Sequence, residues 1–397
     1  MPAVPAAWKD PTPAGIPSAR RLRIACVVSS LRGGGAELVM SRLAAALAER
    51  GHAVRVITFS GDDSDLHHLS SLVQRTALSC EGKSGGLLQR VGNMVRRVRA
   101  LLSALRESAP DVIVSFTDTT NVYALLANQV LRIPIIVSER IDPRFHPVDR
   151  LTASLRLGLY GTADGLVLQT RATCAWAQEL PRQPPTSVIP NPVCPVSADA
   201  DSETAGFRPY VLAVGRLVTQ KGFDTLIRAF ALLVHTKNPR LRLVILGEGA
   251  ERASLEALCA SLGVSGTVFL LGHRTTGPWL ADALMFVLSS RYEGFPNALG
   301  EAMAAGLPIV ATRCPSGPEE MLIDGESGLL VDVGDAPALA AGMSRLADDA
   351  VLRARLGERA RSEAQQRFAP TVIWDAWERA ISDSILHRRG LAPQRIL

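Results

Sequence analysis

The stretch Ser290-Arg-Tyr-Glu-Gly-Phe-Pro-Asn-Ala-Leu-Gly-Glu-Ala-Met-Ala-Ala-Gly-Leu-Pro-Ile-Val-Ala-Thr312 decides the fold of this chain. The apolar run Leu284–Leu288 comes before it and predicts a strand, which ends in a polar loop that carries Glu293. Pro296 suits a first helical position, where its missing N–H costs nothing, and Gly306 suits a helix C-terminus. Leu307–Ala311 predicts a second strand, so the unit is strand, loop, helix and strand.

Two carboxylates lie where such a unit binds its ligand. Glu293 is in the loop and Glu301 is on the second turn of the helix, so both can face the crevice at the carboxyl end of the strand. The backbone N–H groups of Phe295 and Asn297, at the helix start, suit an anion. Carboxylates that can grip hydroxyl pairs, beside an anion-binding helix end, favour a sugar nucleotide as the ligand.

Length and composition indicate a globular protein with two domains. The chain has 397 residues, of which 47% are hydrophobic and 20% are charged, and this is too long for one ordinary core. No apolar run reaches the roughly 18 residues that a membrane span needs. Residues 1–20 lack the apolar stretch of a signal peptide and are expected to be disordered. The six cysteines form no CxxC pair, and we expect reduced thiols, with Cys26 and Cys314 in or beside strands.

The charge is unevenly distributed. Residues 1–195 carry 22 Lys and Arg against 15 Asp and Glu, whereas residues 196–397 carry 21 against 23. A basic first half suits an anionic lipid, a polyprenyl phosphate or a nucleic acid. An arginine-rich composition without functional meaning explains the same imbalance equally well.

Strand-like and helix-like segments alternate from Leu22 onward, which predicts parallel α/β sheets. Residues 194–208 lack an apolar period and predict a hinge. We therefore expect two doubly wound domains, at 21–193 and 209–370, with a cleft between them and a further helix over 371–390. The expected strands are 23–29, 53–59, 111–116, 134–138, 165–168 and 187–189 in the first domain, and 210–214, 241–246, 267–271, 284–288, 307–311 and 328–331 in the second.

Glycines follow the first strand and suit a phosphate. The cluster Gly33-Gly-Gly-Ala-Glu37 stands between that strand and its helix, where free N–H groups at the helix start would form a cradle. It is not a GxGxxG dinucleotide fingerprint. A tight turn from strand to helix explains the cluster equally well.

Two cations follow the first strand of the second domain. Arg216 and Lys221 bracket the loop Gly215-Arg-Leu-Val-Thr-Gln-Lys-Gly222, which opens the next helix. Two positive charges over a helix start can neutralise a diphosphate and stabilise it as it departs. An exposed salt bridge is the structural alternative.

A third loop, after the strand 267–271, carries His273. Backbone groups in such a loop can read the edge of a nucleobase. A plain turn is an equally good interpretation of His273.

The set Glu293-x7-Glu301 within Tyr-Glu-Gly-Phe-Pro-Asn, with Gly-Arg-x4-Lys-Gly upstream and Gly-Gly-Gly-Ala-Glu near the start, resembles the retaining family-4 glycosyltransferases. The resemblance covers residues 22–385. It implies the GT-B fold, with two Rossmann-like domains facing each other across a cleft and the last helix crossing back to the first domain. Val137-Ser-Glu-Arg140 and Ile189-Pro-Asn-Pro-Val193 look like the bacterial branch that builds exopolysaccharide and lipopolysaccharide precursors.

The resemblance also implies roles for residues of this sequence. Glu293 would bind donor-sugar hydroxyls and Glu301 the ribose, while Arg216 and Lys221 would hold the diphosphate. The family uses no metal and no cofactor beyond the nucleotide sugar. Besides these four residues, the donor-binding residues expected from the resemblance and from the loops are Gly34, Gly35, Gly215, His273, Gly294, Phe295, Pro296, Asn297, Ala298 and Leu299.

One departure from the family pattern concerns the first domain. Relatives often place a histidine just after the strand equivalent to 111–116, whereas this chain has Phe116-Thr-Asp-Thr-Thr-Asn121. Asp118, Thr117 or Asn121 would then position the substrate. Asp118 joins Glu293, Arg216 and Lys221 as our candidate catalytic residues. A helix cap is the alternative role for Asp118.

The helix expected at 87–105 has an apolar stripe flanked by arginines. It could lie on an anionic membrane, although a helix between two strands normally packs on the sheet. The basic first domain as a whole favours a lipid-linked acceptor.

The sequence thus predicts a metal-independent glycosyltransferase at the cytoplasmic side of the membrane. It would move a hexose or N-acetylhexosamine from a nucleoside diphosphate sugar, in particular a UDP-sugar, to a growing polyprenyl-linked saccharide, with no nucleic-acid partner. A non-catalytic sugar-nucleotide-binding subunit and a nucleotide-dependent oxidoreductase are the alternatives.

Overall fold

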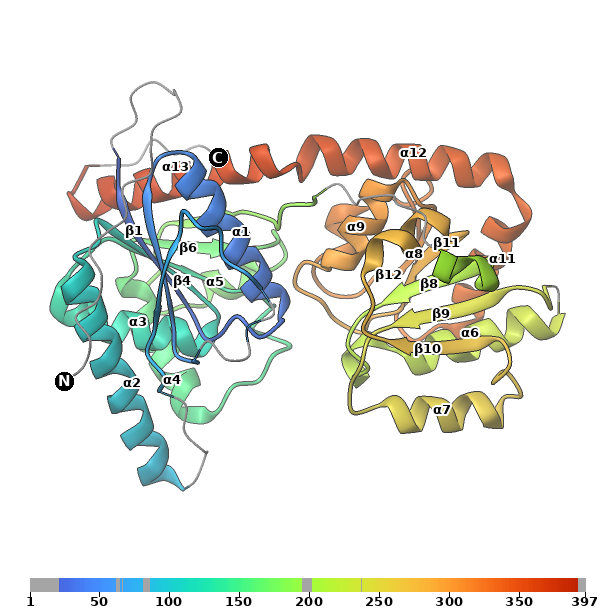
Figure 1. Ribbon diagram of the computed structural model, residues 1–397, viewed down its shortest axis with the longest axis horizontal. Coiled ribbons are helices and arrows are strands. Elements are labelled where there is room, and N and C mark those ends of the chain that lie inside the picture. The colour runs from blue at the N-terminus through green and yellow to red at the C-terminus, as the bar shows by residue number, and fades with distance from the viewer. Residues whose placement is uncertain are drawn as a thin grey trace. The chain divides into compact units, whose positions relative to one another are not determined.

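The structure, a computed structural model, describes residues 21–391 except 62–64, 66, 81–85, 195–201 and 237, and omits the side chains of 87, 88, 202 and 203. The expected disordered segment at residues 1–20 and much of the expected hinge lie outside the described residues. The chain forms two compact units, Met1–Pro190 with Ile373–Leu397, and Asn191–Val372. The boundaries therefore fall after residues 190 and 372, compared with the predicted 193 and 370. Figure 1 shows both units.

Unit 1 contains a parallel sheet of seven strands in the order β3-β2-β1-β4-β5-β6-β7. Its strands are β1 (Arg23–Val28), β2 (Ala53–Thr58), β3 (Gln74–Ala77), β4 (Val112–Phe116), β5 (Ile135–Ser138), β6 (Gly165–Leu168) and β7 (Thr186–Val188). Its helices are α1 (Gly35–Glu49), α2 (Leu87–Ser108), α3 (Asp118–Leu131), α4 (Arg150–Leu159), η1 (Tyr160–Thr162), α5 (Cys174–Gln178) and most of α13 (Pro370–Arg388).

Helices cover both faces of this sheet, and β1 shows how the chain achieves it. Side chains alternate across a strand, so Ile24, Cys26 and Val28 share one buried cluster with α1 and α13. Ala25 and Val27 share the opposite cluster with α2 and α3. Burial on both faces explains why the strands read as nearly continuous apolar runs.

Helix α13 completes unit 1 although it follows unit 2 in the chain. Trp377 is fully buried, and its ring centroid lies 5.5 Å from that of Phe116 at the end of β4. Arg50 at the end of α1 forms ion pairs with Asp375 at 2.7 Å and Glu378 at 2.5 Å. Apolar packing and paired charges therefore fix this helix on the α1 side of the sheet.

Unit 2 contains a parallel sheet of six strands in the order β10-β9-β8-β11-β12-β13. Its strands are β8 (Tyr210–Val214), β9 (Arg242–Leu246), β10 (Val268–Gly272), β11 (Met285–Leu288), β12 (Ile309–Thr312) and β13 (Leu329–Val331). Its helices are η2 (Ser202–Phe207), η3 (Thr219–Lys221), α6 (Phe223–Thr236), α7 (Arg252–Ser261), α8 (Thr276–Asp282), α9 (Asn297–Ala305), α10 (Pro318–Met321), α11 (Ala336–Asp348) and α12 (Ala350–Arg367).

The second sheet is buried in the same way. Val211 and Ala213 of β8 pack with α6, α7 and α11, whereas Tyr210 and Leu212 pack with α8, α9 and α12. Helix α12 lies very close to α9, because a Cβ added at Gly357 would fall 2.1 Å from the carbonyl oxygen of Gly306. Only glycine at residue 357 permits this contact, which supports the helix that carries Glu301.

The predicted fold class, α/β with doubly wound parallel sheets, is confirmed for each unit. Several elements were not predicted, among them β3, an edge strand of the sequence Gln-Arg-Thr-Ala, α4, whose N-cap is Asp149, and the short helices α5, α8 and α10. The described end of the predicted hinge packs on unit 2, where the Phe207 ring lies 5.0 Å from that of Phe269. All six cysteines are free, and Cys26 and Cys314 are buried.

We predict that Gly357→Ala lowers the free energy of unfolding of unit 2 by about 1–3 kcal/mol, because the new methyl group meets backbone that cannot rotate away. Gly158→Ala is the control, since Gly158 is also helical but has open space around its Cβ position. That control should be neutral or stabilise unit 1 by up to about 1 kcal/mol through helix propensity. Denaturant unfolding of both variants measures the difference, and equal effects would contradict the close packing of α12 on α9.

Candidate functional site

The strand orders place a switch point in each sheet. In unit 1 the chain moves outward from β1 in one direction and from β4 in the other, and in unit 2 the same happens at β8 and β11. Helices that follow two such strands cover opposite faces, which leaves a crevice outside their carboxyl ends. Most of the residues predicted to be functional come after one of these four strands.

Lys221 and Glu293 meet at the switch point of unit 2. Lys221 ends η3 after β8, and its Nζ lies 2.6 Å from Oε1 of Glu293, in the loop after β11. The same oxygen accepts a hydrogen bond of 2.6 Å from the hydroxyl of Ser290. Glu293 is only 5% exposed. A Cβ at Gly215 would come within 3.3 Å of the Lys221 side chain, so glycine there lets the lysine reach the carboxylate.

Hydrogen bonds fasten the two loops to each other. Gln220 donates to the carbonyl oxygen of Tyr292 at 2.9 Å and accepts, through its own carbonyl, from the N–H of Arg291 at 2.8 Å. The Ser289 hydroxyl donates to the Lys221 carbonyl at 2.9 Å. These bonds hold the Lys221–Glu293 pair in one geometry. Arg216 is exposed on the loop after β8.

The start of α9 differs from the expectation in its details. Pro296 is the N-cap and α9 begins at Asn297, one residue later than predicted. The N–H of Leu299 donates to the Pro296 carbonyl at 3.0 Å, so it is engaged within the helix start. Phe295 and Leu299 bury their side chains in the core and present only backbone to a ligand. Gly317 packs directly over this loop, because a Cβ there would lie 2.8 Å from the Gly294 carbonyl oxygen.

Glu301 lies on α9 and accepts a hydrogen bond of 3.1 Å from the hydroxyl of Thr276, in the first turn of α8. Asn297 and Ala298 are half-buried, as is Glu301. His273 is exposed in the loop between β10 and α8. The loops after β8, β10 and β11, together with the first two turns of α9, thus carry the predicted donor-binding residues of unit 2.

A side chain of α1 lies against the glycine cluster of unit 1, where the phosphate was predicted to bind. Gly34 is the N-cap of α1, and a Cβ there would lie 2.0 Å from Oε2 of Glu37, so the Glu37 carboxylate lies against the predicted phosphate cradle. Its other oxygen accepts from the Ser30 hydroxyl at 3.3 Å. A phosphate at Gly34 and Gly35 would have to displace this carboxylate.

A pocket of about 490 Å³ opens at the switch point of unit 1. Ser29 and Ser30 follow β1, Thr117–Tyr123 follow β4, and Glu139–Ile141 follow β5, and His146 comes from the next loop; the full lining is Ser29, Ser30, Arg32, Phe59, Ser60, Arg97, Thr117, Asp118, Thr119, Thr120, Tyr123, Glu139, Arg140, Ile141 and His146. Asp118 is the first residue of α3 rather than its cap, since Thr117 occupies the N-cap position.

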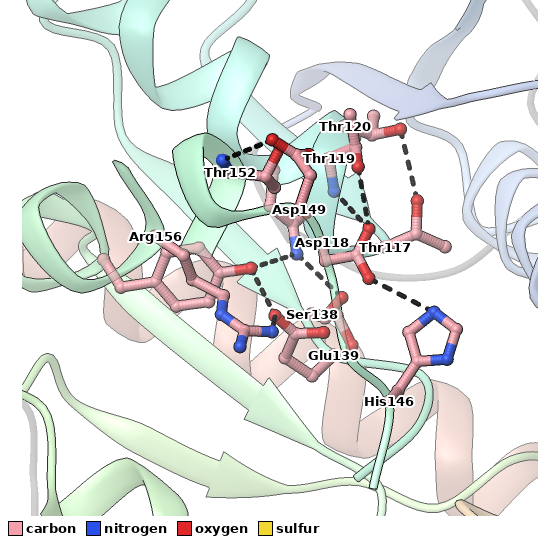
Figure 2. A network of polar contacts seen from close by, with 12 residues as sticks. Thr117, Asp118, Thr119, Thr120, Ser138, Glu139, His146, Asp149, Thr152 and Arg156 are labelled. Carbon is pink, nitrogen blue, oxygen red and sulfur yellow. Dashed lines mark hydrogen bonds and ion pairs between the residues drawn. The ribbon is translucent and has the colours of Figure 1, made fainter. Parts of the chain in front are cut away.

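Figure 2 shows the polar network beside this pocket. One oxygen of Asp118 accepts from the backbone N–H and the hydroxyl of Thr119, and the other lies 3.7 Å from Nε2 of His146. Next to it, Oε1 of Glu139 accepts from the Tyr160 hydroxyl and lies 3.8 Å from the Arg156 guanidinium. Glu139 is 2% exposed. Burial, and then the nearby Asp118 carboxylate, raise the pKa of Glu139 to about 7, although Arg156 and Tyr160 oppose the shift.

The structure thus brings Gly215, Lys221 and Glu293 together, adds Ser290 to them, and pairs Glu301 with Thr276. Gly34, Gly35 and Asp118 lie in unit 1. Sequence reasoning missed Glu139 and His146 as site residues. Glu139 could have been found, because it directly follows the apolar strand β5, as Asp118 nearly follows β4. His146 lies in a loop without a motif, and only the tertiary structure places it beside Asp118.

Two family models match the chain. The model described as "Glycosyl transferases group 1" matches residues 198–363, and the one described as "Glycosyl transferase 4-like domain" matches residues 34–192. The lipopolysaccharide core biosynthesis glycosyltransferase LpsD of Rhizobium meliloti is 30% identical over 353 residues, which are 87% of this chain and 94% of that protein. The chain belongs to the group 1 glycosyltransferase family.

Other relatives of this family match with different coverage. A GalNAc-GalNAc-diNAcBac-PP-undecaprenol α-1,4-N-acetyl-D-galactosaminyltransferase of Campylobacter jejuni is 27% identical over 91% of this chain and 99% of that enzyme. The glycosyltransferase LpsE of Rhizobium meliloti is 41% identical, but over only 45% of this chain and 51% of LpsE. For LpsE, the chain spans about half of the relative's length.

Solved structures show the same fold. Sucrose-phosphate synthase of Thermosynechococcus elongatus superposes with a TM-score of 0.78 at 22% identity, over 90% of this chain and 98% of that one. HepE of Anabaena, solved with UDP and glucose, gives a TM-score of 0.77 at 20% identity, over 91% and 100%. The group 1 glycosyltransferase described here therefore has the GT-B fold, as predicted.

We predict that Lys221→Met destabilises unit 2 by about 3–5 kcal/mol, because it leaves the Glu293 carboxylate buried without its cation. The double variant Lys221→Met/Glu293→Gln should recover most of this loss, since no charge is then buried and the Ser290 hydroxyl keeps an acceptor. A double-mutant cycle from denaturant unfolding measures the coupling. Additive effects of the two substitutions would contradict a stabilising pair.

We predict a pH-dependent effect of Glu139→Gln on the stability of unit 1. Because the folded pKa of Glu139, about 7, exceeds its ordinary value of 4.5, the folded state holds the proton more tightly and loses stability as pH rises from about 4.5 to 7. Glutamine has no such loss, so the variant should gain up to about 3 kcal/mol on wild type between pH 4.5 and 8. Unfolding at both pH values measures this gain. Glu49→Gln, at an exposed helical carboxylate, is the control and should show no comparable change.

Proposed function

We propose that this protein is a retaining glycosyltransferase that moves a hexose or N-acetylhexosamine from a UDP-sugar to a growing polyprenyl-linked saccharide in cell-surface polysaccharide synthesis. The observation that carries the proposal is the ion pair of half-buried Lys221 with buried Glu293 at the switch point of unit 2. It joins a cation suited to phosphate and a carboxylate suited to sugar hydroxyls at the point of an α/β sheet where nucleotides bind.

The donor would bind along the loops after β8 and β11 and the start of α9. Lys221 and exposed Arg216 would neutralise the diphosphate, Glu293 would accept hydrogen bonds from donor-sugar hydroxyls, and Glu301 would accept them from the ribose. Positive charge at the departing diphosphate stabilises the transition state, because negative charge develops there as the glycosidic bond breaks. With this charge in place the reaction would need no metal ion and no further cofactor.

The chemistry would proceed on one face of the sugar. The bond from the anomeric carbon to the phosphate oxygen breaks through an oxocarbenium-like state, and its electron pair stays with the diphosphate. The acceptor oxygen bonds to the same face of that carbon, and its proton passes to the departing phosphate oxygen. The anomeric configuration is retained, and the products are the extended saccharide and UDP.

A lipid-linked acceptor is supported by charge and by a relative. The Campylobacter enzyme acts, by its name, on an undecaprenyl-diphosphate-linked saccharide. The basic first half of the chain suits the diphosphate of such an acceptor and the anionic surface of the membrane that holds it. No helix in the described parts of the chain is long and apolar enough to cross a bilayer. We therefore propose peripheral attachment at the cytoplasmic side of the plasma membrane.

We predict that UDP-sugars, but not GDP- or ADP-sugars, raise the melting temperature of the wild-type protein, since a ligand that binds the folded state stabilises it. Glu301→Ala should lower the affinity for UDP-sugar at least tenfold, because it removes the proposed ribose contact. Glu358→Ala, at an exposed carboxylate on α12, is the matched control and should bind as wild type does.

Transfer measured with and without EDTA tests metal independence in the same preparation. Wild-type affinity in Glu301→Ala would contradict the donor assignment. Binding of a UDP-sugar without hydrolysis or transfer, across a panel of sugars and acceptors, would favour a non-catalytic sugar-nucleotide-binding subunit.

A further inference from the structure

The pocket of unit 1 joins three side chains that suit a sugar hydroxyl better than an anion. Asp118 lines it from the first position of α3, Glu139 from the residue directly after β5, and His146 from the loop that follows. The lining contains three arginines. Arg32 is exposed, and the other two contact the protein itself: Arg97 donates to the Cys80 carbonyl at 3.2 Å and to the Tyr123 hydroxyl at 3.3 Å, and Arg140 lies 4.3 Å from the centre of the Phe116 ring. Carboxylates and an imidazole form hydrogen bonds with hydroxyl groups, and the two carboxylates repel a phosphate.

The loop that carries His146 is fixed by a buried carboxylate. Asp142 is fully buried and accepts from the backbone N–H of Arg144 at 3.0 Å and from the Arg144 guanidinium at 2.7 Å. The same guanidinium donates to the Ala172 carbonyl at 2.9 Å, which ties the loop to the segment after β6. The Phe145 N–H donates to the Asp142 carbonyl at 3.1 Å and closes the turn. His146 follows this turn directly and is therefore held in place.

The position of Asp118, which faces His146, is also fixed by its neighbours in the chain. Thr117, directly before it, has φ of 74°, a backbone conformation that costs a β-branched residue energy and is concentrated at functional sites. Thr119 holds one Asp118 oxygen, so the other faces the imidazole (Figure 2). Nε2 is the ring nitrogen that lies toward Asp118, which leaves the other ring nitrogen, Nδ1, for a ligand. The His146 side chain is 47% exposed, so a ligand can reach it.

Glu139 lies beside this pair and is almost fully buried. All hydrogen bonds and ion pairs of its side chain with the described residues fall on Oε1. Its second carboxyl oxygen is the group that the pocket can use. A carboxyl group and an imidazole at neighbouring positions can bind two hydroxyls of one sugar ring.

We propose that Asp118, Glu139 and His146 form the subsite for the acceptor sugar, and that His146, oriented by Asp118, accepts a hydrogen bond from one of its hydroxyl groups. The ligand class is a neutral saccharide with free hydroxyls, at the end of the acceptor chain. This inference rests on the proposed function for its place in the reaction, but the binding of a saccharide to unit 1 can be measured without any donor.

The test combines binding and kinetics. The probes are p-nitrophenyl α-glycosides of glucose, galactose and N-acetylgalactosamine, and their binding to the full-length protein is measured by saturation-transfer NMR without nucleotide. We expect His146→Ala and Asp118→Asn to lose the signal of the glycoside that wild type binds, and His146→Gln to keep part of it, because glutamine retains an acceptor. His68→Ala, at another exposed histidine of unit 1, should bind as wild type does.

In transfer assays His146→Ala should raise the KM of the acceptor at least tenfold, whereas the KM of the UDP-sugar should change much less. A merely structural role would move both KM values together. Unchanged glycoside binding and an unchanged acceptor KM in His146→Ala would overturn the proposal. If wild type binds no UDP-sugar but His146→Ala still loses glycoside binding, the proposed function fails while the subsite stands.

Discussion

Burial of both sheets on both faces is the constraint on which the rest of the structure depends. Where the central strands are packed under helices on both faces, polar groups that act on a ligand stand at the ends of the strands. Lys221 and Glu293 in unit 2, and Asp118 and Glu139 in unit 1, occupy such places.

The two units differ in how far the charge of a buried carboxylate is compensated by its neighbours. Glu293 has a lysine at 2.6 Å and a hydroxyl at 2.6 Å, so its charge is compensated where it stands. Glu139 has a hydroxyl donor and a guanidinium at 3.8 Å, and a second carboxylate nearby. Its charge is less well compensated, and its raised pKa is the consequence. Unit 2 thus holds a fixed ion pair, while unit 1 holds a carboxyl group that can exist in either protonation state near neutral pH.

The residues of the candidate site in unit 2 could be predicted from local sequence, because that site is built from turns that directly follow strands. Gly215, Pro296 and Gly306 mark those turns, and the spacing from Gly215 to Lys221 fits one short loop. Unit 1 was less predictable. His146 reaches Asp118 only through the turn around buried Asp142, and no local pattern reports that contact. Strand β3 was not predicted from the sequence, because an edge strand needs no continuous apolar run. The Glu37 carboxylate at Gly34 stood within the quoted glycine motif, but its backward reach depends on a side-chain rotamer.

The position of α13 in the chain has a consequence for how the protein folds while the ribosome makes it. Ribosomes complete residues 191–372 before α13 exists, so unit 2 can close its core while one face of the unit 1 sheet still lacks the side chains of Trp377 and Ile381. The domain that begins first is therefore finished last. A nascent chain at that stage carries an uncovered apolar face, the kind of surface that chaperones hold and that drives association between incomplete chains.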